Sequence, residues 1–182
     1  MPFLNINYDY FNIYLLKNCK FFIGTQSGMQ QLAYLFERNC LITNIVRIFE
    51  DIPMTAKCRS IAKTPYFRSQ KNILSIKQYL DLPYAYHHQF FINNELGYLE
   101  NSQEDLCLAV KEFYELVNTK IFSEPILDDN QKNFNKLLLE KFLLYLKNDK
   151  DLINHRNKIY LLKKLKGMKG SFSSFFLNKN FN

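Results

Sequence analysis

The chain has 182 residues, of which 47% are hydrophobic and 16% aromatic. This is enough apolar material for one sizeable core, which excludes a largely disordered protein. The formal net charge of +7 allows attraction to nucleic acid, anionic lipid or phosphorylated ligands, without choosing among them.

The basic residues gather closely at one place only, near the end of the chain. We interpret this group either as a solvated face or as a contact with an anionic membrane surface. Its members are Lys163, Lys164, Lys166 and Lys169.

The cysteines give no sign of a metal site or of a disulfide framework. Cys19, Cys40, Cys58 and Cys107 lie far apart and form no CxxC pair. The first residues lack the basic region of a signal peptide and carry Asp9 within their apolar part. No later run is apolar for long enough to span a membrane. We therefore expect a cytoplasmic protein, and leave open a peripheral contact at the inner membrane.

The first part of the chain follows the order helix, strand, turn, helix, strand. Residues 8–16 predict a short helix and 19–23 a buried strand, which Gly24 ends. From Ser27 the apolar residues fall at helical spacing, and residues 40–44 predict a second strand. The apolar positions of that helix are Met29, Leu32, Ala33 and Phe36. This order is typical of a βαβ unit, whose strands are parallel with a right-handed crossover.

The middle of the chain carries fewer signals. Residues 45–75 have weak periodicity, which predicts an irregular connection around an active-site edge. Ser75 is placed to cap a short helix that runs to Leu80. Ser102 and Asp105 resemble a capping box, and the apolar stripe that follows predicts a helix over 103–118.

The last third is predicted to be helical. Helices are expected over 129–147 and 151–165, and the glycines, serines and asparagines beyond them predict a loosely ordered tail. We therefore divide the chain into an α/β domain at 1–120 and a helical C-terminal extension at 121–182.

The turn after the first strand holds two of the five glycines. Backbone N–H groups and the dipole at a helix start attract anions, so Gly24 and Gly28 would let a phosphate approach the backbone. Thr25, Gln26 and Ser27 would add side-chain donors. In the alternative interpretation this is a plain turn, with Ser27 as N-cap and Gly28 chosen for close packing. The turn has neither the lysine of a P-loop nor the GxGxxG of a dinucleotide fold.

The segment KFFIGTQSGMQQLAYLFERNCLITN resembles a motif in the C-terminal half of GT-B glycosyltransferases. It is most similar to a group of bacterial enzymes linked to surface polysaccharides, which carry a strand, Gly-Thr-Ser/Gln-Ser-Gly, a helix and a strand that closes in Thr-Asn. The later segments ILSIKQYLDL and GYLENSQEDLCLAVKEFYEL look like the closing segments of that group. The resemblance covers roughly residues 21–116, about half the chain.

The resemblance implies an α/β fold with a Rossmann-like parallel sheet and flanking helices, the C-terminal half of a GT-B fold, followed by C-terminal helices. It implies that the diphosphate of a nucleotide sugar lies near Gly24, Thr25, Gln26, Ser27 and Gly28. Asn44 is expected as a second contact, because ligands lie at the carboxyl ends of parallel strands. We expect no metal and no other cofactor, and assign no catalytic residue.

The implied function is transfer of a sugar from a nucleotide-sugar donor to a glycan or lipid-linked acceptor in surface-polysaccharide synthesis. A GT-B enzyme needs two Rossmann-like domains, and a chain of this length holds one. We therefore expect a separate N-terminal acceptor domain as a partner. The alternative is a non-catalytic fragment or binding module. No basic-aromatic surface for nucleic acid stands out.

Two groups of charged residues in the 45–75 connection are candidates for contacts with the donor or acceptor, and in the alternative interpretation they are ordinary surface residues. Glu50 and Asp51 could serve as a base or bind a sugar hydroxyl, or be exposed loop acids. Arg47, Lys57 and Arg59 could offset the phosphate charge of the donor.

Two further pairs come later in the chain. His87 and His88 make a poor metal pair, because neighbouring side chains point apart. Glu95 and Glu100 precede the capped helix, where a carboxylate often binds the donor in GT-B domains, and neither is assigned firmly.

Overall fold

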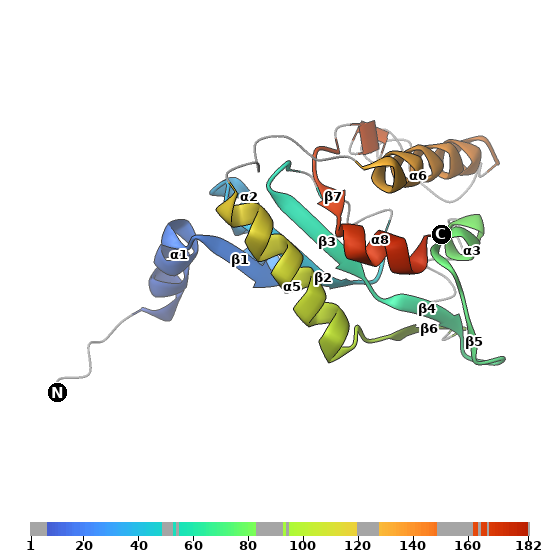
Figure 1. Cartoon of the computed structure of the whole chain (residues 1–182), viewed down its shortest axis with the longest axis horizontal. Coiled ribbons are helices and arrows are strands. Elements are labelled where there is room, and N and C mark those ends of the chain that lie inside the picture. Colours follow the sequence, from blue (N-terminus) through green and yellow to red (C-terminus); the bar gives the residue numbers. More distant parts are fainter. Residues whose placement is uncertain are drawn as a thin grey trace.

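A parallel sheet of four strands lies at the centre of the molecule (Figure 1). The computed structural model describes residues 7–48, 53, 55–82, 93, 95–119, 128–148, 162–163, 165–166 and 168–181. Each neighbouring pair of strands in this sheet is parallel. The order across the sheet is β1 (Phe21–Gly24), β2 (Asn39–Ile45), β3 (Cys58–Ala62) and β7 (Ser171–Phe172).

Helices flank this sheet, so the fold is α/β and compatible with a Rossmann-like architecture. Helix α5 (Gln103–Asn118) crosses in front of the sheet in Figure 1, and α2 (Gly28–Leu35) lies behind it. The other helices are α1 (Tyr8–Asn18), α3 (Ile76–Asp81), α6 (Asp129–Asn148) and α8 (Ser174–Asn180). The described strands do not show the reversal of order that marks a complete doubly wound sheet. The GT-B half therefore stays a prediction.

The predicted βαβ unit is confirmed. Strands β1 and β2 pair in parallel, with Phe21 opposite Asn39 and Gly24 opposite Ile42. Helix α2 connects them and buries Ala33 against the sheet. Two local signals predicted this unit: the period of 3.6 residues in the helix and the apolar run of each strand. Both lie within a few neighbouring residues, so the sequence was sufficient to find them.

The expected irregular connection over residues 45–75 is wrong. This stretch contains β3, β4 (Thr64–Phe67) and β5 (Asn72–Ile73). Strand β4 lies between β5 and β6 (Leu96–Leu99) in a second, antiparallel sheet. The sequence of β3, Cys-Arg-Ser-Ile-Ala, mixes polar and apolar residues, yet all five positions are buried. A strand buried on both faces shows no alternation for a sequence pattern to detect.

The capped helices agree with the predictions. Ser75 and Gln78 form a full capping box at the start of α3. The Ser102 hydroxyl accepts a hydrogen bond from the backbone N–H of Asp105 at 3.1 Å, and α5 begins there. Helix α6 matches the helix predicted over 129–147. The helix expected over 151–165 lies mostly outside the described residues.

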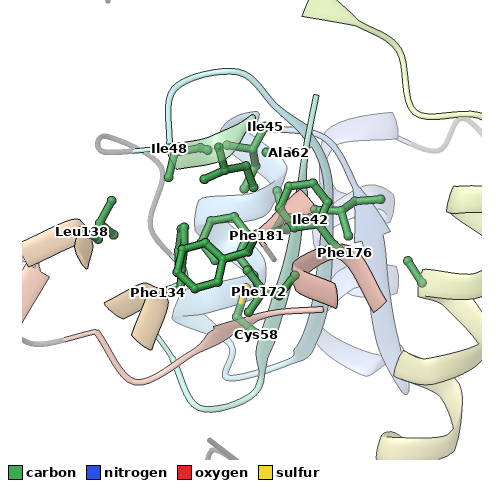
Figure 2. Packing of buried hydrophobic residues seen from close by; sticks show 14 of the residues in the cluster. Ile42, Ile45, Ile48, Cys58, Ala62, Phe134, Leu138, Phe172, Phe176 and Phe181 are labelled. Atoms are coloured by element: carbon green, nitrogen blue, oxygen red, sulfur yellow. The ribbon is translucent and has the colours of Figure 1, made fainter. Parts of the chain in front are cut away.

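The predicted loosely ordered tail is instead part of the core. Ser171 and Phe172 form β7 beside β3, and α8 follows. The rings of Phe172 and Phe181 lie with centroids 5.0 and 5.4 Å from that of Phe134 in α6 (Figure 2). Burial of these aromatic rings outweighs the turn-forming tendency of the glycines and serines around them. The described C-terminal residues thus share the sheet and core of the first part of the chain.

Acidic and amide side chains hold this C-terminal segment. The Glu112 carboxylate accepts hydrogen bonds from the Ser173 hydroxyl at 2.6 Å and from the backbone N–H groups of Ser174 and Phe175 at 2.9 and 3.1 Å. The amide oxygen of Gln131 accepts from the backbone N–H of Phe172 at 2.7 Å. The segment is therefore fixed by polar contacts as well as by its aromatic rings.

We predict that Glu112→Ala lowers the free energy of unfolding by about 2–4 kcal/mol, because it leaves partly buried donors without their charged acceptor. Urea unfolding measures the change. The matched control is Glu115→Ala, since Glu115 is exposed on the same helix, and its effect should stay within about 0.5 kcal/mol. Equal effects of the two substitutions would show that the Glu112 contacts do not stabilise the fold.

Candidate functional site

The turn between β1 and α2 presents an open helix start. Strand β1 ends at Gly24, and α2 begins at Gly28 after the N-cap Ser27. The Ser27 backbone is extended, and its side chain makes no capping hydrogen bond. Thr25, Ser27 and Gly28 are exposed. The first N–H groups of α2 are therefore not occupied by the N-cap side chain and face a solvent-exposed turn.

The two glycines of this turn differ in their surroundings. A Cβ added at Gly28 would meet no atom within 4 Å, so the prediction that close packing selects this glycine is wrong. A Cβ added at Gly24 would lie 2.7 Å from the far end of the flexible Phe22 ring. Neither glycine has a positive φ. Open access to the backbone at Gly28 thus remains as a reason for a glycine there.

Asn44 lies at the same edge of the sheet as the turn. It stands near the carboxyl end of β2, which is parallel to β1, and the Thr43 hydroxyl donates to the carbonyl oxygen of Gly24 at 3.3 Å. The Asn44 backbone has φ 59°, a left-handed conformation that asparagine tolerates better than most residues. The structure therefore places the turn and Asn44 at one edge of the sheet, and their binding of a donor stays a prediction.

Asn101 joins this site and was missed by the sequence analysis. Its amide nitrogen donates to the Oδ1 atom of Asn44 at 2.9 Å and so fixes the orientation of that side chain. Asn101 directly precedes Ser102, the N-cap of α5. The sequence shows it beside a helix start, but only the fold shows that this start reaches the end of β2.

Two of the three cations predicted to offset phosphate charge do not reach the turn. Arg59 is 3% exposed and donates to the carbonyl oxygens of Ala56 and Cys58 at 3.1 and 3.0 Å. Burial lowers the pKa of its guanidinium, and the nearby charge of Glu112 works in the opposite direction. Lys57 lies at the amino edge of the sheet, with its Nζ 3.8 Å from a Glu37 carboxylate oxygen.

The remaining candidates lie at the carboxyl edge, on the second sheet or outside the described residues. Arg47 is exposed just beyond β2, at the edge that carries the turn. Glu100 pairs with Lys63 just after β3, and Glu95 is exposed. The structure does not describe five further candidates, which are Glu50, Asp51, His87, His88 and Lys164.

A cluster of thiol and phenol side chains lies between α2 and the sheet. The Tyr34 hydroxyl is 3.2 Å from the Cys58 sulfur and accepts a hydrogen bond from the Gln30 amide at 2.8 Å. Burial raises the pKa of Cys58 to about 11 and raises those of Cys40 and Tyr34 above their usual ranges. These groups are protonated at neutral pH, and the contact between Tyr34 and Cys58 joins α2 to β3.

Within the described ranges, no group of three or more His, Cys, Asp or Glu side chains is arranged to hold a metal ion. In the same part of the chain, no helix combines the length and apolarity needed to cross a membrane. Comparison with protein-family models, curated proteins and solved structures finds no match to this chain.

We predict that Cys107 reacts with a thiol reagent in the folded protein, while Cys40 and Cys58 react only on unfolding. Cys107 is exposed on α5, whereas the other two are buried and protonated. Mass spectrometry after labelling with and without urea locates the modified residues. Fast labelling of Cys58 without urea would contradict the packing of α2 on the sheet.

The left-handed backbone at Asn44 gives a second prediction. Both Asn44→Ala and Asn44→Gly remove the amide that Asn101 contacts, but glycine adopts this conformation without strain. We expect the alanine variant to be less stable than the glycine variant by about 1–2 kcal/mol, measured by urea unfolding. Equal stability would mean that the backbone relaxes out of this conformation at no cost.

Proposed function

We propose that this chain is the donor-binding half of a glycosyltransferase and holds a nucleotide sugar with its diphosphate at the β1–α2 turn. The observation that carries the proposal is the open helix start at Ser27 and Gly28, at the carboxyl edge of a parallel sheet. Backbone N–H groups and the helix dipole favour an anion at such a start. Ligands of α/β sheets bind at this edge.

The same groups would assist sugar transfer. Charge builds up on the diphosphate as it leaves the sugar, and fixed N–H dipoles stabilise that charge without rearranging. Arg47, exposed at the same edge, is placed to add a positive charge. The Asn44 amide, held by Asn101, is a candidate for a second contact to the donor. The acceptor in this proposal is a glycan or a lipid-linked saccharide of surface-polysaccharide synthesis.

A second candidate is a binding module that acts only with a separate N-terminal acceptor domain. Helix α1 supports it, because Tyr8, Tyr10 and Tyr14 are 79%, 74% and 64% exposed and only Leu16 of this helix is buried. A helix with so much uncovered aromatic surface is typical of an interaction site. Nucleotide-sugar binding without transfer to any acceptor by the chain alone would favour this candidate. Peripheral contact of the exposed Lys163, Lys166 and Lys169 with anionic lipid fits either candidate.

The test is a thermal-shift titration with UDP, GDP, ADP, CMP and their sugar conjugates. A ligand that binds only the folded state stabilises it by about 2.7 kcal/mol at a hundredfold excess over Kd. We expect one nucleotide and its conjugates to raise the Tm, and Ser27→Asp to abolish the rise because its carboxylate repels phosphate. Gly28→Ala should also weaken binding, because its Cβ would stand where the phosphate approaches the backbone. The fold should stay intact, because that Cβ meets no protein atom within 4 Å.

The matched control is Ser75→Asp, which adds the same charge at the N-cap of α3, in another part of the molecule (Figure 1). Aspartate caps helices as well as serine does, so neither aspartate variant should lose stability through its cap. Absence of any shift in a protein that melts cooperatively would reject the donor-binding proposal. An equal loss of binding in both aspartate variants would reject the assignment to the turn.

A further inference from the structure

Helix α1 has little packing within the described part of the chain. Its N-cap is Asn7, whose side chain accepts a hydrogen bond from the backbone N–H of Asp9 at 3.0 Å. Of its 11 residues only Leu16 is buried, and Figure 1 shows the helix at the outer end of the molecule, away from α6 and α8. An isolated helix of this length is marginal in water, because helices are stabilised mainly by packing one face. A further molecule that covers α1 would supply that packing.

The exposed face of α1 is aromatic. The helical repeat of about 3.6 residues places Tyr10, Ile13 and Tyr14 on one stripe. Their exposed fractions are 74%, 38% and 64%. Lys17 continues this stripe by one turn, and Leu35, at the end of the neighbouring α2, is 72% exposed. The stripe and its surroundings form the kind of apolar surface that marks an interaction site.

The uncovered area is close to what a dimer needs. At about 200 Å² for a fully exposed side chain of this size, six apolar side chains of α1 and α2 leave roughly 750 Å² uncovered. Each partner in a stable complex contributes about 800 Å². Because the side chains are spread around the helix, one interface covers only part of them, which predicts a micromolar association. They are Tyr8, Tyr10, Phe11, Tyr14, Leu15 and Leu35.

The charges of α1 make this surface complementary to itself. Asp9 lies in the first turn and Lys17 in the last, and both are exposed. Each stands four positions from Ile13, one on either side of it. When two such helices pack antiparallel about a twofold axis near Ile13, Asp9 of each copy faces Lys17 of the other. A parallel pair would instead bring like charges and like helix ends together.

We propose that two copies of this chain associate through α1, with the helices antiparallel and the stripes of Tyr10, Ile13 and Tyr14 packed against each other. A separate acceptor domain would have to match the charges of α1 through its own sequence, whereas a second copy matches them by symmetry. The association needs no bound nucleotide, so it is tested independently of the proposed function.

The experiment is sedimentation velocity of the full chain from about 1 to about 300 μM, a range that covers micromolar association. We expect the wild type to pass from monomer to dimer within this range. Asp9→Lys and Lys17→Asp each place two like-charged pairs in the interface, and each should weaken the dimer about tenfold or more. Both sites are exposed, so the rest of the fold is preserved.

An equimolar mixture of the two single variants separates charge pairing from damage to the helix. One copy then carries lysine at both positions and the other carries aspartate at both, so every pair across the interface is attractive. We expect the mixture to regain the affinity of the wild type. Each substitution opposes the helix dipole, and mixing cannot repair a helix that is lost for that reason.

The matched control is Glu104→Lys, which makes the same change of charge in the first turn of α5 and should leave the dimer unchanged. A dimer that withstands both single variants, or variants that mixing does not rescue, would overturn the antiparallel pairing of α1. A wild type that stays monomeric would overturn the proposal altogether. Binding of that monomer to vesicles of phosphatidylcholine and phosphatidylglycerol, lost on changing Tyr10→Ser and Tyr14→Ser, would then assign the face to a lipid surface instead.

Discussion

The parallel pairing of β2 on both of its edges is the constraint on which the rest of the structure depends. Residues 40–43 of this strand are all buried, so a slip of register would move polar groups into the core. Pairing with β1 brings the end of that strand, and hence the start of α2, beside Asn44. Pairing with β3 positions Arg59 and Cys58 inside the molecule. The candidate site is a consequence of these two pairings.

This arrangement buries several polar groups. Ser60, Ser171 and Ser173 are almost completely buried, as is Arg59. Such groups are tolerated only where hydrogen bonds replace those lost with water. The Glu112 carboxylate accepts from the Ser173 hydroxyl and from two backbone N–H groups that follow it, and its charge also acts on Arg59. A single acidic residue on α5 therefore stabilises both the last helix and a buried cation in the sheet.

Sequence alone predicted the parts of the fold whose signals are local. The helical spacing after Ser27 and the cap at Ser102 each lie within a few residues, and both were interpreted correctly. Strand β3 was missed because full burial removes the alternation that identifies a strand. The contact between Asn101 and Asn44 joins residues 57 positions apart, and no local pattern encodes it. The turn and Asn44 could thus be placed at one edge of the sheet from the sequence, whereas the contact of Asn44 with Asn101 could not.

The placement of β7 and α8 has a consequence for synthesis on the ribosome. Among the described residues, this segment is translated last, yet it covers the outer edge of β3 and buries Phe172 and Phe176. Until it emerges, a nascent chain exposes an unpaired strand edge and an apolar gap against α6. Unpaired edges of this kind associate with other chains. Copies terminated before residue 171 would therefore be recognised by chaperones or would aggregate. They would keep the β1–α2 turn but lack β7, the strand that completes the parallel sheet.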